Sequence, residues 1–73
     1  MSTAAKVGVI LDKLRDEANV SVKSLAEQTM IARQTLQRRL KGDPGITFDE
    51  VERIASALGT TTESVWALAR EVA

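Results

Sequence analysis

The sequence contains no cysteine, no histidine and no tyrosine. Without cysteine there is neither a disulfide framework nor a thiolate metal site, and without histidine a metal would depend on carboxylates, which suit only hard cations. Histidine, the commonest general base of enzymes, and cysteine, a strong nucleophile, are thus missing, although carboxylates remain. We therefore expect a protein that is not an enzyme and that holds no metal and no cofactor.

Long apolar runs are equally scarce. The longest, Val7–Leu11, contains Gly8 and is far too short to cross a bilayer, and the first residues do not resemble a secretory signal. At 73 residues the chain predicts one small domain over residues 1–73, of modest stability. We expect it to be cytoplasmic, with no membrane partner and no small-molecule ligand.

Helical spacing of apolar residues is what the sequence does contain. Apolar residues recur three and four apart, as in helices that bury one stripe, and no stretch alternates for long enough to predict a strand. The expected fold is all-α, a compact five-helix bundle with Leu25, Leu36, Ile54 and Leu58 in its core. The expected helices lie near 3–18, 22–29, 32–41, 47–58 and from 60–62 to the end, the last with a stripe of Val65, Leu68, Ala69 and Val72.

Polar residues mark where these helices begin. Ser21 is suited to cap the second helix, because its hydroxyl can accept a hydrogen bond from a free backbone N–H. Thr47 and Glu50 have the spacing of a capping box, and so do Thr60 and Glu63. We therefore expect the fourth helix to open at Thr47 and the cap of the fifth to come from residues 60–62.

One short stretch, "ARQTLQRRLKG" at 32–42, stands apart from the balanced charge of the chain. The whole sequence has 10 basic and 10 acidic residues, yet this stretch holds four cations and no acid. As a helix it would place Leu36 and Leu40 on one side and long donors and amides on the other. Arginine can grip guanine and glutamine can grip adenine in a DNA major groove. A merely solvated helix face usually mixes charges, so nucleic acid is favoured over that alternative.

The second and third helices, joined by about three residues, have the form of a helix-turn-helix. Ala26 is small where the two helices would cross, and Ile31 and Leu36 can anchor the turn and the third helix. On the segments "SLAEQTMIARQTLQRRLKG" and "FDEVERIASALGTTTESV", nearly the whole chain resembles the lambda-repressor-like, Cro/repressor-type (XRE-like) helix-turn-helix family. Small members of that family are phage or prophage regulators, single-domain repressors and antitoxins.

The resemblance implies a set of DNA contacts, with a recognition helix at about 32–41 in the major groove. Met30 stands where the family usually has glycine, and Arg39 stands where it usually has leucine, with Leu40 next. Arg39 can equally serve as an intramolecular salt-bridge partner. The implied base contacts are Arg33, Gln34, Gln37 and Arg38, and the implied phosphate contacts are Lys23, Thr35, Arg39, Lys41 and the N–H groups near Thr47.

The expected function is that of a sequence-specific transcriptional regulator that binds double-stranded DNA, with a palindromic operator read by a two-fold dimer. The dimer is expected to be weak alone and firmer on DNA. Trp66 either covers the first helix or stands half exposed as the dimer contact. Two alternatives remain open: an antitoxin-like or adaptor module that binds an acidic protein, and a recombination accessory factor.

Overall fold

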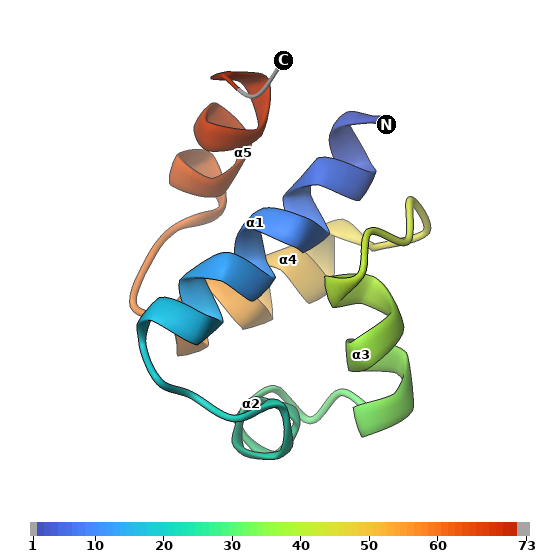
Figure 1. The fold of residues 1–73 in the computed structure, drawn as a ribbon, viewed down its shortest axis with the longest axis vertical. Coiled ribbons are helices and arrows are strands. Elements are labelled where there is room, and N and C mark those ends of the chain that lie inside the picture. Colours follow the sequence, from blue (N-terminus) through green and yellow to red (C-terminus); the bar gives the residue numbers. More distant parts are fainter. Residues whose placement is uncertain (1, 72–73) are drawn as a thin grey trace.

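Residues 2–71 are described by a computed structural model, and within them the chain forms helices and no strand. The all-α prediction is confirmed, and Val72, expected to end the last apolar stripe, lies outside the described residues. None of the described helices is long and apolar enough to cross a membrane. The helices, shown in Figure 1, are α1 (Thr3–Glu17), α2 (Val22–Thr29), α3 (Arg33–Leu40), α4 (Phe48–Ala57) and α5 (Thr62–Glu71).

Side-chain caps start the helices largely where the sequence predicts them. The Ser21 hydroxyl accepts a hydrogen bond from the N–H of Ser24 at 3.0 Å, and the Thr47–Glu50 capping box is complete. The cap of α5 lies within the predicted residues 60–62, but it is not a Thr60–Glu63 box. The Thr61 hydroxyl instead accepts from the N–H of Ser64 at 3.1 Å, so α5 begins one residue later than that box requires.

The core takes at least one fully buried side chain from every helix. Leu25, Leu36 and Ile54 are completely buried, as expected. Leu58 is only partly buried, because it follows the last residue of α4 and packs at the edge of the core. The largest fully buried side chains are Leu11, Leu25, Leu36, Ile54, Val7, Val51 and Val65.

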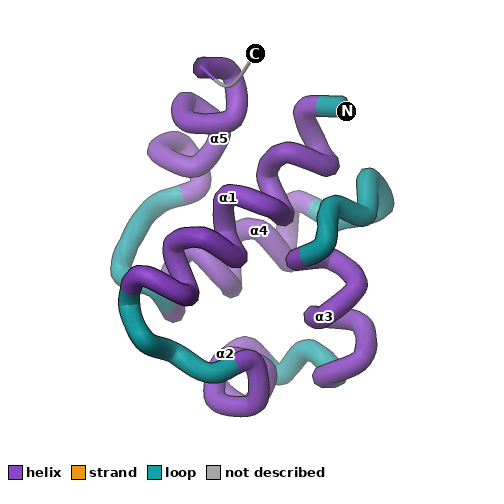
Figure 2. Tube along the Cα trace, viewed as in Figure 1, coloured by secondary structure: helices purple, strands orange, loops and turns teal. Residues whose placement is uncertain are grey.

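Helix α1 passes through the centre of the fold and packs against α3, α4 and α5, while α2 packs against α3 and α4 (Figure 2). At Gly8 the two backbones of α1 and α3 come close together. A Cβ atom on this residue would overlap the backbone carbonyl oxygen of Arg39. Glycine at this position therefore lets the end of α3 lie directly against α1.

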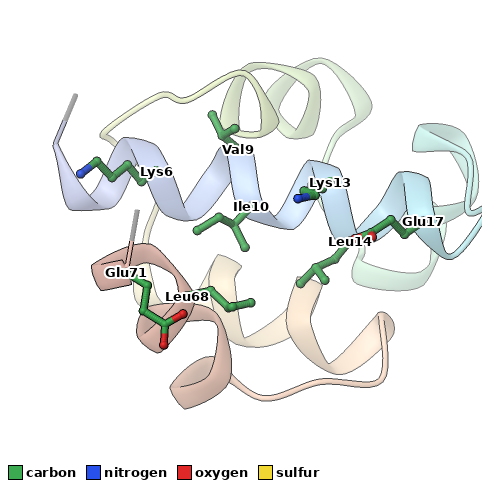
Figure 3. A pocket seen from close by; sticks show the side chains of 8 residues that line it. All are labelled: Lys6, Val9, Ile10, Lys13, Leu14, Glu17, Leu68 and Glu71. Atoms are coloured by element: carbon green, nitrogen blue, oxygen red, sulfur yellow. The ribbon is translucent and has the colours of Figure 1, made fainter. Parts of the chain in front are cut away.

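An apolar groove runs along the surface where α1 and α5 pack together (Figure 3). It has a volume of about 500 Å³ and lies on the side of α1 where α5 packs. Val9 and Leu68 are both partly exposed in it, and charged side chains line its rim. The lining residues are Lys6, Val9, Ile10, Lys13, Leu14, Glu17, Leu68 and Glu71.

The contact at Gly8 leads to a stability prediction. Gly8→Ala should lower the free energy of unfolding by about 1–3 kcal/mol, because the new methyl group forces the backbones of α1 and α3 apart. This loss should appear although alanine is otherwise about 1 kcal/mol better than glycine inside a helix. Urea unfolding followed by circular dichroism measures the change.

The neighbouring change Val9→Ala is the control, since Val9 is partly exposed and should alter stability by only about 0.5 kcal/mol. A Gly8→Ala protein as stable as the parent would show that α1 and α3 do not touch at this point.

Candidate nucleic-acid interface

The turn between α2 and α3 is closed by a buried threonine. The Thr29 hydroxyl donates to the carbonyl oxygen of Leu25 at 2.8 Å and lies 3.4 Å from the N–H of Ile31, from which it accepts. Met30 ends α2 in the left-handed conformation, with φ of 60°, and its side chain is 86% exposed. Methionine therefore adopts the backbone conformation that glycine favours, at a cost of about 1–2 kcal/mol.

Helix α3 has a buried and an exposed side. Leu36 and Leu40 are buried, which confirms the predicted rotation of the helix and shows that the apolar anchor lies at Leu40 beside Arg39. Thr35 and Arg39 are half buried. The exposed cations and amides are Arg33, Gln34, Gln37, Arg38 and Lys41. The four residues implied as base contacts are therefore all exposed, as is Lys41, and we call these five residues the reading face. Gln34, Gln37, Arg38 and Lys41 lie away from Leu36 and Leu40, whereas Arg33 is on the side of the leucines and is exposed at the first position of the helix.

The amino end of α3 carries no acidic residue. Ala32 caps it without any side-chain hydrogen bond, so the first backbone N–H groups of the helix point outward without a side-chain partner. Such an end favours an anion. Lys23, near the start of α2, is also exposed.

The amino end of α4, unlike that of α3, is acidic. The Thr47 N–H donates to Glu50 Oε1 at 2.8 Å, and the Glu50 N–H donates to the Thr47 hydroxyl at 3.1 Å. Asp49 and Glu50 also place two carboxylates in the first turn. The N–H of Thr47 thus already donates to Glu50. The phosphate contact there stays a prediction, and the two nearby carboxylates would repel a phosphate.

Arg39 is committed inside the protein. Its Nε donates to Glu50 Oε1 at 2.9 Å and its Nη1 donates to Asp43 Oδ2 at 2.5 Å, and only 15% of the side chain is exposed. The Asp43 carboxylate also accepts from the N–H of Gly45 at 2.8 Å. Arg39, Asp43 and Glu50, which we call the Arg39 cluster, therefore join the end of α3 to the loop and to the start of α4.

The pKa values of the Arg39 cluster keep all three groups charged at neutral pH. The N–H of Gly45, with Arg39 and Arg38, holds the pKa of Asp43 below its usual value. Burial acts to raise the pKa of Glu50, but the N–H of Thr47 and the Arg39 guanidinium outweigh it and lower that pKa. Burial acts to lower the pKa of Arg39, and its bonds to Glu50 and Asp43 raise it more.

The ion pairs show Arg39 as the intramolecular salt-bridge partner that the sequence allowed. Its phosphate contact stays a prediction, which the two carboxylates make less favourable. Sequence reasoning missed Asp43 and Glu50 as its partners. Asp43 lies four residues after Arg39, a spacing that permits a helical ion pair, whereas Glu50 comes close only through the fold.

The cluster also predicts how stability depends on pH. A carboxyl whose pKa is lower in the folded state stabilises the fold fully above its unfolded pKa, about 4, and loses this as the pH falls through the folded value. Glu50→Gln should therefore lower the free energy of unfolding by about 1 kcal/mol at pH 7. The gap to the parent should shrink below about pH 4. Urea titrations at several pH values measure it.

Glu52→Gln is the matched control, because Glu52 is an exposed carboxylate of α4 and is not part of an ion pair within the described residues. It should leave stability nearly unchanged at every pH. A constant gap between the Glu50→Gln protein and the parent down to pH 2 would contradict the role given to the Glu50 carboxylate.

Comparison with known families points to the same region of the fold. A sequence model of the Cro/C1-type helix-turn-helix DNA-binding domain matches residues 11–63, more than half of the chain. The match includes all of α2, α3 and α4. No curated protein and no solved structure matches the chain. With the predicted helix-turn-helix present and its reading face exposed, the chain belongs to the Cro/C1-type helix-turn-helix DNA-binding domains.

Proposed function

We propose that this DNA-binding domain is a sequence-specific regulator of the phage Cro or repressor kind, which inserts α3 into the major groove of its operator. The observation that carries the proposal is the reading face, whose five exposed side chains are all cations or amides, while Leu36 and Leu40 hold α3 in the core. Side chains of this kind suit the edges of guanine and adenine.

Base contacts are assigned to the exposed cations and amides of α3. Arg33, Gln34 and Gln37 come first, and Arg38 follows them. All four are exposed, and they lie within two turns of one helix. A helix of this length reads only a few base pairs, so these residues would account for most of the sequence preference.

Phosphate contacts are assigned around these residues. Lys23 and Lys41 are exposed cations at either side of the helix-turn-helix, and Thr35 lies in the first turn of α3 beside its uncapped N–H groups. Residues 21–42 contain five cations against the single acid Glu27. The acidic remainder of the chain would keep non-specific affinity low, since that affinity is almost wholly electrostatic.

The first test separates base contacts from phosphate contacts. Gln34→Ala should weaken operator binding by about 1–3 kcal/mol and relax the preference at one base position, and Arg33→Ala should do the same at another. Lys41→Ala should weaken binding to all sequences alike and flatten the salt dependence by about one unit of slope. Selection of bound sites from random DNA, followed by titrations at several salt concentrations, measures both effects.

Gln28→Ala provides the control, because it makes the same chemical change on α2, at an exposed residue outside the reading face. Operator affinity and preference that survive Gln34→Ala intact would show that the reading face is assigned to the wrong residues. Failure of the parent protein to select any DNA sequence would refute the proposed function itself.

We further propose that two copies bind a palindromic operator, with their recognition helices about 34 Å apart, one turn of DNA. Trp66 supports this as the dimer contact. It is half buried and lines a hollow with the exposed Phe48, and the residues that share the hollow come from α4, α5 and their loop, with none from α1. A contact centred on two aromatic side chains would bury less surface than a stable interface needs, so pairing would be weak without DNA.

Trp66→Ala should therefore reduce the cooperative occupation of two half-sites while a single half-site still binds. Gel-shift titrations on one-site and two-site duplexes measure this. Leu58→Ala, which also removes a half-buried side chain at the end of α4, controls for lost stability and should keep cooperativity. A tight dimer in sedimentation of the free protein, or one copy saturating the whole operator, would contradict the weak two-fold contact.

A further inference from the structure

Within the described residues, the Arg38 guanidinium is hydrogen-bonded through one of its three nitrogens. Its Nε donates to Asp43 Oδ2 at 3.1 Å, while 62% of the side chain is exposed. The Asp43 bond is the only one that its guanidinium makes within the described residues, which leaves both Nη groups available. Arg38 is thus an exposed arginine of the reading face whose direction is set by a carboxylate outside α3.

Asp43 is fixed firmly enough to set that direction. Its Oδ1 accepts from the N–H of Gly45 at 2.8 Å, and its Oδ2 accepts from Arg39 Nη1 as well as from Arg38. Only 22% of its side chain is exposed, and the pKa of its carboxyl is lowered, first by the Gly45 N–H. The carboxylate is therefore charged at neutral pH and cannot rotate without breaking its other bonds.

The arrangement has a chemical consequence for base recognition. A guanidinium is a planar fork of five N–H donors, and it grips guanine through two of them at once, on O6 and N7. With Nε held by Asp43, the pair left to face the groove is Nη1 and Nη2. A long side chain that is already oriented also loses less rotational freedom when it binds.

We propose that Asp43 is a specificity-determining positioning residue, which holds Arg38 so that its two Nη groups meet one guanine of the operator. This inference rests on the proposed function, in which Arg38 lies in the major groove. Asp43 has opposite effects on base preference and on overall affinity for DNA. It sharpens the choice of guanine through Arg38, and its negative charge beside the reading face lowers affinity for DNA of any sequence.

The decisive variant is Asp43→Asn, which keeps an oxygen for the N–H of Gly45 but removes the charge that holds Arg38. Preference for guanine at one base position should fall about 3- to 10-fold, while affinity for unrelated DNA rises. A merely structural role would weaken both. The measurement uses duplexes of the selected site with each base at that position, titrated with the folded protein at two salt concentrations.

Glu50→Gln is the matched control. It also removes one carboxylate from Arg39, with the same change of charge, but Glu50 does not touch Arg38. It should leave the preference for guanine unchanged. In an Arg38→Ala background, Asp43→Asn should cause no further loss of base preference, because its effect passes through Arg38.

Several results would overturn the proposal. Equal losses of guanine preference in Asp43→Asn and Glu50→Gln would show a general effect on the loop. A loss that persists in the Arg38→Ala background would show that Asp43 acts through another residue. Arg38→Ala that weakens all sequences alike would make Arg38 a phosphate contact. In each of these cases the parent still selects a sequence, so the proposed function stands.

If Asp43→Asn does not fold, Arg38→Lys decides the matter, because it leaves Asp43 and its loop bonds in place. Lysine keeps the charge but lacks the fork and the Nε that Asp43 holds. It should weaken the guanine preference about 3- to 10-fold, since lysine can contact guanine but is not held by Asp43, while keeping the salt dependence of the parent. A guanine preference as strong as that of the parent would show that the Nε held by Asp43 is not needed, and would refute the role of Asp43.

Discussion

The burial of Leu36 and Leu40 fixes the structure on which everything else depends. These two side chains, one turn apart, are the apolar anchors of α3, and they hold it against the core formed by the other helices. Because they set the rotation of α3, they also decide which five side chains face solvent. Gly8 adds to this by letting α1 reach the backbone at the end of α3.

The Arg39 cluster fixes the carboxyl end of α3 through side chains. An apolar side chain at this position would have to pack against other apolar groups. Arg39 instead forms ion pairs with the carboxylates of Asp43 and Glu50 at the edge of the fold. A guanidinium with two hydrogen-bonded carboxylates is satisfied even where water is scarce. The same carboxylates cap the loop and α4, so one set of charges orders three neighbouring segments.

Much of the fold could be predicted from the sequence because its signals are local. Apolar spacing predicts the five helices, Ser21 and Thr47 predict the caps of α2 and α4, and Leu36 with Leu40 predicts which side of α3 is buried. What was missed depends on contacts between distant residues. The Arg39–Glu50 pair spans eleven positions, and the depth of Leu58 and Trp66 depends on how α4 meets α5. Thr61 rather than Thr60 caps α5, a choice of one residue among three adjacent threonines that spacing alone does not resolve.

The division of α3 into anchors and exposed positions bears on how such a protein can evolve. Exchanges at exposed positions usually change stability by only about 0.5 kcal/mol, so Arg33, Gln34 and Gln37 can drift without unfolding the chain. Arg38 is more constrained, because a replacement that cannot donate a hydrogen bond would leave the Asp43 carboxylate without one of its partners. Under the proposed function, new specificities should therefore arise independently at three positions, whereas a change at Arg38 should be accompanied by a change at Asp43, its partner in the following loop.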